Sequence, residues 1–228
     1  ALQEARIGAV PPLPDVTRFA APSAVMPDPR LVASAAKLLS EAKHPVILAG
    51  RVSRSEDGWN ARVALAEKLQ AHVLTDSKVG AAFPTDHPLH AGVPGNFLSP
   101  AGAQTLRQAD VVLSLDWVDL AGTLKQAFGT EGTPAKIVQV SADAHLHRGW
   151  SMDYQALPPV DAYLQCEPDS AVPLLLDAAK ARPKAAPAGR DSLPEAVSDV
   201  VSIRALADAL NKATEGMPVC ITHLPLGW

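Results

Sequence analysis

The sequence predicts an α/β protein with a doubly wound, mostly parallel sheet of about six strands and helices on both faces, a Rossmann-like architecture. Strand and helix patterns alternate between residues 28 and 182. The strands are continuous apolar runs, which is typical of strands that are covered on both faces. Parallel strands need crossover connections, and the helices between the strands supply them.

The first helix of this pattern begins at Asp28, a good N-cap, with Pro29 in the first helical position. We expect it to end near Lys43, ahead of Pro45, because the residue before a proline is biased against helix. Its predicted apolar face consists of Leu31, Ala35, Leu38 and Ala42. A buried strand over residues 45–49 follows.

A second helix is capped by Asp57 or Ser55, and a second strand covers residues 72–75. The apolar face of this helix is predicted to be Trp59, Val63, Ala66 and Leu69. The remaining elements are a loop over 77–96, a helix over 99–108, a strand over 110–116, a helix over 120–128, strands over 136–141 and 161–166, and a helix capped by Asp169 or Ser170. These elements complete the alternation.

The chain divides into four parts by composition. Residues 1–27 are rich in proline and read as a linker from a missing N-terminal domain, and residues 28–182 form the α/β domain. Residues 183–200 form a second linker, and residues 201–228 contain a helix capped by Ser202 and a strand over 217–222. One helix and one strand bury too little surface to fold alone, so we expect the last part to begin a truncated domain.

Composition excludes several functional classes. The net charge of −4 and the isoelectric point near 6.0 give no cationic field for nucleic acid or an anionic membrane. No apolar run approaches the roughly 20 residues of a membrane-spanning helix, and the opening residues do not resemble a secretory signal. Cys166 and Cys220 lie far apart, which suits a reducing compartment, so we expect a cytoplasmic protein.

Catalytic signatures are absent from the sequence, which has no G-x-S-x-G, H-E-x-x-H or P-loop motif. His145 and His147 in DAHLHRGW would share one face of a strand, but no third ligand lies near them, so we predict no metal site. His87 and His90 flank a proline turn, where hydrogen bonding is the expected role. We therefore predict no catalytic residue in this chain.

The candidate site lies in the loops after the strands, because ligands of open α/β sheets bind at the carboxyl ends of the strands. Gly50 would make a tight turn, Arg51 would contact a phosphate through two hydrogen bonds, and Asp143 would accept a ribose hydroxyl. The alternative is structural: Gly50 only turns the chain, Arg51 pairs with a carboxylate and Asp143 caps a helix. The candidate nucleotide-crevice residues are Gly50, Arg51, Ser53, Ser77, Gly92, Gly95 and Asp143.

The order of the sequence blocks resembles the central domain of thiamine diphosphate-dependent enzymes, which include acetolactate synthase, benzoylformate decarboxylase and oxalyl-CoA decarboxylase. The resemblance covers residues 26–182, and its blocks are DPRLVASAAKLLSEAKHPVILAGR, ALAEKLQAHVLTDSKVGAAFPTDHPLHAGVPG, QADVVLSLDWVD and KIVQVSADAHLHRG. Residues 201–228 resemble the beginning of the family's pyrophosphate-binding domain. The proline-rich opening resembles the linker that leaves its pyrimidine-binding domain.

The resemblance implies an enzyme that acts on 2-keto acids as a decarboxylase or an acetolactate synthase-like transferase. Family members have three α/β domains and assemble as homodimers or homotetramers. Their thiamine diphosphate lies between the first domain of one subunit and the third domain of another. A glutamate in the first domain activates it, and a G-D-G…N motif in the third holds Mg²⁺ and the diphosphate; this chain lacks both. We therefore expect the full-length enzyme to bind thiamine diphosphate and Mg²⁺, and this chain to bind neither and to be inactive alone.

The resemblance also bears on the crevice, because the central domain of relatives binds FAD, ADP or nothing. Gly92 and Gly95 in HAGVPGN match the turn glycines of the family. Where the binders commonly carry a glycine, this chain has Leu115 followed by Asp116, whose carboxylate would repel a diphosphate. The sequence thus favours a scaffold without a nucleotide. The alternative is a free-standing module for FAD, ADP or NAD, whose binding would be lost on Arg51→Ala.

Overall fold

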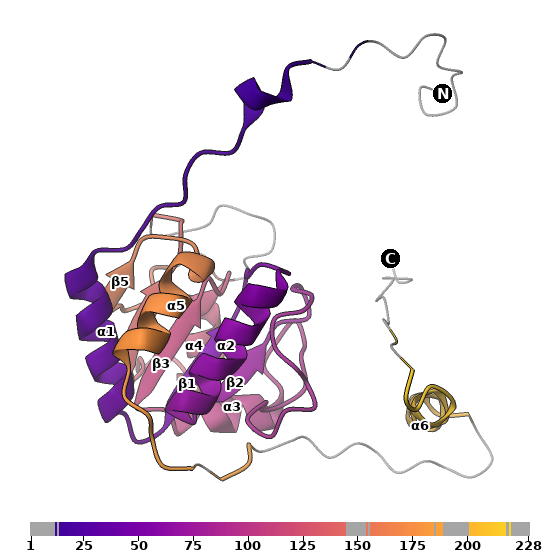
Figure 1. Cartoon of the computed structure of the whole chain (residues 1–228). Helices are drawn as coiled ribbons and strands as arrows, with labels where there is room; N and C mark the ends of the chain where they lie inside the picture. The colour runs from indigo at the N-terminus through magenta and orange to yellow at the C-terminus, as the bar shows by residue number, and fades with distance from the viewer. Residues whose placement is uncertain are drawn as a thin grey trace. The chain divides into compact units, whose positions relative to one another are not determined.

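The computed structural model describes residues 12, 14–144, 154, 156–184, 186–188, 201–217 and 219. It divides the chain into two units, Ala1–Gly189 and Arg190–Trp228, which are described separately. In the first unit, a short 3₁₀ turn at Val16–Phe19 stands in an exposed lead-in, and the α/β domain follows it (Figure 1).

The domain is built on one sheet of five parallel strands within the described residues, in the order β2-β1-β3-β4-β5. The strands are β1 Pro45–Ala49, β2 His72–Thr75, β3 Val111–Leu115, β4 Lys136–Val140 and β5 Ala162–Leu164. The predicted parallel α/β sheet is confirmed, with five strands where about six were expected. Every residue of β1 and β3 is buried, as their continuous apolar sequences predict.

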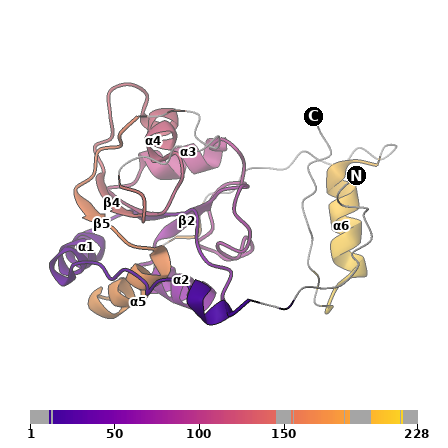
Figure 2. The same cartoon turned by 90° about the horizontal axis from the view of Figure 1, so that it is seen from above.

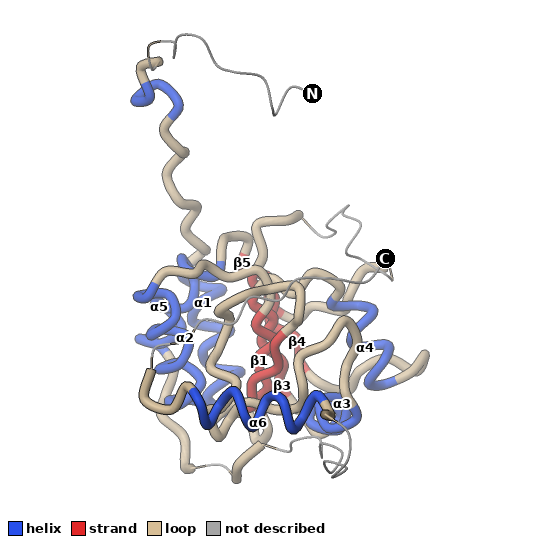
Figure 3. The backbone as a smooth tube through the Cα atoms, turned by 90° about the vertical axis from the view of Figure 1, so that its right-hand side faces the viewer, coloured by secondary structure: helices blue, strands red, loops and turns tan. Residues whose placement is uncertain are grey.

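Helices cover both faces of the sheet, as predicted. The helices are α1 Pro29–Glu41, α2 Glu56–Leu69, α3 Pro100–Arg107, α4 Leu120–Phe128 and α5 Pro168–Ala178. Helices α1, α2 and α5 lie on one side and α3 and α4 on the other (Figure 2), with the strands between the two layers (Figure 3). Alternate residues of β1 serve the two cores: Ile47 packs towards α1, α2 and α5, and Leu48 packs towards α3 and α4.

Two helix faces differ from those that the sequence predicted. In α1 the buried residues are Val32, Ala35, Ala36 and Leu39, while Leu31 is 38% exposed. The two adjacent alanines lie at the centre of the stripe because small side chains let the helix backbone approach the sheet. In α2 the buried residues are Arg62, Leu65, Ala66 and Leu69, and Trp59 and Val63 are only partly buried.

The helix caps follow the predicted chemistry in most cases. Asp28, Ser55 and Ser99 each accept a hydrogen bond from a backbone N–H in the first turn of α1, α2 and α3. Helix α5 differs, because its N-cap is Glu167, which makes no side-chain cap hydrogen bond. Asp169, predicted as a cap, lies instead inside the first turn and forms an ion pair with Arg62 at 3.3 Å.

After α5 the chain crosses from one helical layer to the other along the amino ends of the strands. We call the described residues of 180–188 the amino-edge strap. The backbone N–H of Lys180 donates to Ser40 Oγ at 2.9 Å, and that of Arg182 to the carbonyl of Lys68 at 2.9 Å. Ala188, in the core under α3 and α4, donates to the carbonyl of Pro88 at 2.9 Å. The start of the predicted 183–200 linker therefore packs on the domain.

The second unit contains α6, Ile203–Ala213, whose predicted cap Ser202 accepts a hydrogen bond from the N–H of Ala205. None of its described residues is buried, and Leu206 is 60% exposed. Most of the strand predicted over 217–222 lies outside the described residues. Among the described residues of both units, no helix has the length and apolar character that crossing a bilayer requires.

Candidate functional site

The strand order locates the place where a ligand of this fold would bind. In a sheet of order 2-1-3-4-5 the winding reverses between β1 and β3, and the loops after these strands diverge around a crevice. Gly50 and Arg51 follow β1, and Asp116 and Trp117 follow β3. Two of the residues predicted from the sequence, Gly50 and Arg51, thus lie at this reversal point.

The backbone itself closes the base of the crevice. The N–H groups of Gly50 and Arg51 donate to the carbonyls of Leu115 and Asp116, both at 3.0 Å. A Cβ on Gly50 would lie 2.4 Å from the Asp116 oxygen and 2.6 Å from Trp117 Cα. Gly50 is therefore required for close packing of two backbone segments. Its φ is not positive, so the close approach of the backbone, and not a left-handed conformation, is the reason that glycine is needed here.

The Arg51 side chain is neutralised by the protein. Its Nη2 donates to Asp116 Oδ1 at 2.9 Å and also pairs with the Asp143 carboxylate. Ser141 Oγ donates to the same Asp116 oxygen at 2.6 Å. Burial lowers the pKa of Arg51, but the hydrogen bonds to Asp116 and Asp143 outweigh it, and the net pKa is raised. Two carboxylates therefore pair with the guanidinium group that a phosphate would need.

Asp116 adopts an unusual backbone conformation at this point. Its φ is 54°, in the left-handed region that glycine adopts most readily and aspartate tolerates better than most residues. Its N–H donates to the carbonyl of Val140 at 2.7 Å, so the turn is fixed by β4. Asp116 thus combines a glycine-like backbone conformation with a carboxylate that pairs with Arg51.

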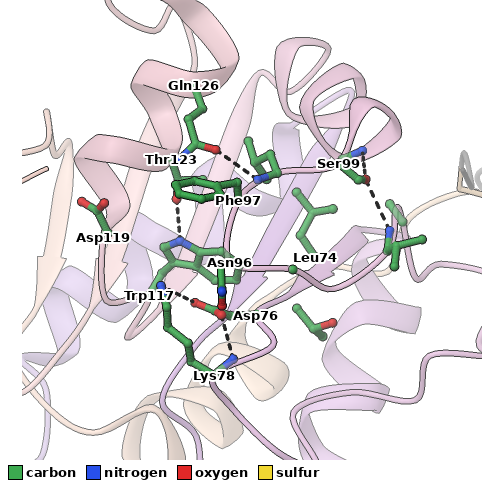
Figure 4. Close-up of a pocket in the computed structure, with 16 residues that line it drawn as sticks. Leu74, Asp76, Lys78, Asn96, Phe97, Ser99, Trp117, Asp119, Thr123 and Gln126 are labelled. Carbon is green, nitrogen blue, oxygen red and sulfur yellow. Dashed lines mark hydrogen bonds and ion pairs between the residues drawn. The ribbon is translucent and has the colours of Figure 1, made fainter. Parts of the chain in front are cut away.

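A cavity beside this cluster, on the α3 and α4 side, is largely filled by Trp117 (Figure 4). The indole Nε1–H donates to Thr123 Oγ1 of α4 at 2.7 Å, and Trp117 is only 8% exposed. The remaining cavity volume is about 20 Å³, room for about one water. Cavities that bind small molecules are typically about 300–1,000 Å³. The carboxylates of Asp76 and Asp119 also line it.

Three of the predicted residues shape the loop over 77–98, which runs along the edge of β2. Ser77 Oγ donates to Asn96 Oδ1 at 2.9 Å, and Gly95 forms a bridge with Asp76. Gly92 has a φ of 67°, and a Cβ there would lie 2.7 Å from Ser99 Oγ. These residues cover the open edge of the sheet. Of the three, only Gly95 lines the cavity that Trp117 fills.

Ser53 lies near the start of α2, where its Oγ is 2.9 Å from Ser55 Oγ and its carbonyl accepts a hydrogen bond from Arg62. The structure therefore joins Gly50, Arg51 and Asp143 through the Asp116 cluster. Ser53 makes its described contacts elsewhere.

Arg62 is a buried arginine that holds several loop carbonyls by hydrogen bonds, and the sequence pattern did not predict this role. It is 2% exposed and donates to the carbonyls of Ala82 at 3.0 Å, Ala81 at 3.2 Å and Ser53 at 2.9 Å. Burial lowers its pKa, while Asp169 opposes the shift. The available signal was its spacing, since Arg62 lies three and four residues before the core residues of α2.

The other reactive side chains have structural surroundings. His90 Nε2 lies 2.9 Å from Thr75 Oγ1, and His87 lies 3.3 Å from a Glu67 oxygen. Burial, with the charge of Glu167, raises the pKa of the Cys166 thiol to about 11, so it is not a nucleophile at neutral pH. No group of three metal-ligating residues is found in the described part of the chain. His145, His147 and Cys220 lie outside it.

Comparison with known proteins gives a consistent result. Residues 32–165 match the family described as the thiamine pyrophosphate enzyme, central domain. The sulfoacetaldehyde acetyltransferase of Roseovarius nubinhibens is 40% identical over 130 residues, which cover 56% of this chain and 21% of that protein. The acetolactate synthase large subunit of Corynebacterium glutamicum is 30% identical over 89 residues, 39% of this chain and 14% of that protein.

A solved structure shows the same fold. The benzoylformate decarboxylase of Polynucleobacter necessarius superimposes with a TM-score of 0.61 at 19% identity, over 92% of this chain and 38% of that one. The matched part spans about a fifth of the length of the curated relatives. The predicted resemblance is thereby confirmed: this chain belongs to the thiamine pyrophosphate enzymes and contains their central domain.

Proposed function

We propose that this chain supplies the central domain of a full-length thiamine diphosphate-dependent enzyme that cleaves a 2-keto acid and transfers the acyl unit. Acyl transfer is favoured over simple decarboxylation because the matching curated relatives are named as acetyltransferases or as an acetolactate synthase. Sulfoacetaldehyde acetyltransferases reach 46% identity over 89 residues, against 30% for the acetolactate synthase. In that enzyme this domain would be a scaffold that holds its neighbours, with no nucleotide in its crevice.

The observation that carries the scaffold role is the neutralised Arg51. A diphosphate approaching Arg51 would have to displace Asp116 and Asp143, and each displaced carboxylate would then repel it. Trp117 occupies the adjacent space, and its indole N–H is already satisfied by Thr123. The carboxylates of Asp116 and Asp143 thus take the place of a nucleotide's phosphates, and the indole of Trp117 takes the place of its base.

The described residues do not fit thiamine diphosphate or Mg²⁺. The crevice holds the carboxylates of Asp116 and Asp143, the cavity beside it has about 20 Å³ of free volume, and the described residues contain no cluster of metal ligands. We therefore place both groups in other domains of the full-length enzyme. The expected contribution of this chain is to hold those domains, with residues 1–27 and 183–200 as connections and 201–228 as the start of the next domain.

We also propose that the full-length enzyme is a homodimer or homotetramer in the cytoplasm. Central domains of related architecture span less than half of the enzymes that contain them, which leaves the remaining domains to build an interface. A buried, protonated Cys166 is consistent with a reducing compartment.

Calorimetric titration tests the scaffold role. We expect the purified chain to bind FAD, ADP and thiamine diphosphate with Mg²⁺ no more tightly than a dissociation constant of about 1 mM. Micromolar binding of FAD or ADP that Arg51→Ala abolishes would instead support the free-standing nucleotide module.

The catalytic proposal is tested on the full-length protein that contains this segment. With thiamine diphosphate and Mg²⁺ it should consume a 2-keto acid such as pyruvate and transfer the acyl group to an acceptor. The same preparation without thiamine diphosphate is the control. A full-length protein that neither binds thiamine diphosphate nor consumes any 2-keto acid contradicts this part of the proposal, whatever the titrations of the single domain show.

A further inference from the structure

A second and larger cavity lies at the opposite edge of the sheet. It has a volume of about 630 Å³ and lies among the amino ends of β1 and β2, helix α3 and the amino-edge strap. This volume is within the range of small-molecule sites, unlike that of the crevice at the carboxyl edge. The described strap residues Arg182, Pro183, Lys184, Ala186 and Pro187 form one wall of the cavity.

The lining of this cavity is basic. Its ionisable residues are Lys43, His44, His72, Arg182 and Lys184, and no aspartate or glutamate is among its described lining residues. The whole chain has a net charge of −4, so this concentration of one sign is a local feature. Asp110 lies nearby, but its two oxygens accept the backbone N–H groups of Lys43 and His44 at 2.6 and 2.8 Å.

The fold uses only part of this hydrogen-bonding capacity. Arg182 Nη2 donates to the carbonyl of Lys43 at 3.0 Å, and His72 Nε2 lies 3.0 Å from the carbonyl of Ala186. Arg182 Nη1 is buried and has no hydrogen-bond partner. Nη1 has almost no accessible surface, so an anion in the cavity would compensate its charge at a distance rather than accept a hydrogen bond from it. Among the described residues, neither Lys43 nor Lys184 forms an ion pair.

Helix ends explain some of these cations but not all. Helices α2 and α3 end at this edge with the caps Gln70 and Gln108, and cations near a helix C-terminus offset its partial negative charge. The hydrogen bond from Arg182 Nη2 to a carbonyl just beyond α1 has this role. It leaves unexplained why Nη1 is buried without an acceptor beside a cavity of this size.

We propose that the cavity under the amino-edge strap binds a phosphorylated small molecule. The ammonium groups of Lys43 and Lys184 bind the phosphate, and the charge of Arg182, whose Nη1 lies buried beneath the lining, adds to the positive field. The amides of Gln104 and Gln108, which also line the cavity, serve the uncharged part of the ligand. This site lies at the edge of the sheet away from the Arg51 cluster, and it does not depend on the proposed catalytic activity.

Inorganic pyrophosphate is the probe for this site. We expect titration of the 228-residue chain, followed by calorimetry and by the amide NMR shifts of Lys43, His44, Val46, Arg182, Lys184 and Ala186, to show saturable binding. The double variant Lys43→Gln, Lys184→Gln should weaken it at least tenfold. The amines of both lysines donate no described hydrogen bond, so the variant should unfold at the same denaturant concentration as the wild type. Lys37→Gln, on the exposed face of α1, is the matched control and should bind as the wild type does.

Absence of saturable binding would overturn the proposal. So would an equal loss of affinity in Lys37→Gln, because that result would mean general attraction to surface lysines. Arg182→Gln gives a second measurement. Its loss of affinity supports the site when unfolding shows that the strap and domain remain intact, and unchanged affinity in that variant contradicts it.

Discussion

Asp116 shows what a single residue decides in this fold. Its position after a buried strand was visible in the sequence, and so was the carboxylate where relatives carry glycine. Its partner was not, because Arg51 lies 65 residues away and only strand pairing brings the two together. Of the two roles that the sequence left open for Arg51, pairing with a carboxylate is the one that the structure shows. Sequence alone could not decide between them, since a guanidinium serves either role equally well.

Gly50 offers a prediction at the same scale. In Gly50→Ala the new Cβ would lie 2.4 Å from the Asp116 oxygen, and backbone on both sides cannot yield without breaking the hydrogen bonds between β1 and β3. We expect the free energy of unfolding, measured with urea, to fall by about 1–3 kcal/mol or more.

The matched control is Gly80→Ala, whose Cβ would lie 3.7 Å or more from its nearest neighbours, all in the Arg54 side chain. Gly80 has no positive φ, so this variant should be neutral or gain up to about 1 kcal/mol. Equal stability of the two variants would mean that the two loops separate easily and that the crevice is not closed by its backbone.

At the scale of elements, local sequence signals were sufficient to predict which helices and strands exist and in which order they follow along the chain. Asp28 and Ser202 were predicted as caps, Ser55 was one of two candidates with Asp57, and all three serve as caps. Errors arose where a neighbouring element decides the outcome. Asp169 was a reasonable cap for α5 by its chemistry, but the buried Arg62 of α2 needs a carboxylate, and Asp169 supplies it. Capping propensity alone does not take account of this competition between α5 and Arg62 for the Asp169 carboxylate.

Ser99 joins two elements and is open to a direct test. Its Oγ accepts the N–H of Gly102 at 3.1 Å, capping α3, and that of Val93 at 3.3 Å from the loop along β2. Ser99→Ala removes the acceptor of both hydrogen bonds, and we expect a loss of about 1–2 kcal/mol in the free energy of unfolding.

Ser34→Ala, in the exposed interior of α1, is the control and should gain about 0.5 kcal/mol because alanine is the better helix former. If Ser99→Ala were as stable as this control, the cap hydrogen bonds would contribute nothing to α3.

At the scale of the whole molecule, the strand order and the amino-edge strap were beyond the sequence. The neighbouring strands β1 and β3 are separated by α2, β2 and α3 along the chain, and apolar runs of similar composition pair equally well in several orders. The sequence did not predict the strap because the prolines and alanines of residues 183–188 give this segment the composition of a linker. Its docking depends on groups such as the Lys68 carbonyl, which any sequence would present.

The dependence of stability on pH is a property of the whole domain. Burial opposes ionisation of Asp110 and Asp161, but hydrogen bonds from the N–H groups of Lys43 and His44, and from Lys136 and the Ile137 N–H, outweigh it. The folded-state pKa of each is therefore below the ordinary value of 3.8. Their stabilisation is complete above that value and is lost as the pH falls through it to the folded-state pKa.

We expect the free energy of unfolding to be level between about pH 5 and 7 with respect to these two groups and to fall below about pH 4. Urea unfolding of the wild type and of the double variant Asp110→Asn, Asp161→Asn at several pH values measures it. The variant should be less stable at pH 7 and show a shallower decline in acid. Parallel curves would mean that neither carboxylate is stabilised by folding.

The amino-edge strap has a mechanical consequence. Because it is fastened at Lys180 and Arg182 to one helical layer and at Ala188 to the other, tension applied beyond Ala188 loads several hydrogen bonds in shear before it reaches α5. These hydrogen bonds would isolate the sheet from movements of any group that is attached to the C-terminal segment. Sliding or rotation there would be absorbed outside the domain, and the domain would act as a rigid anchor.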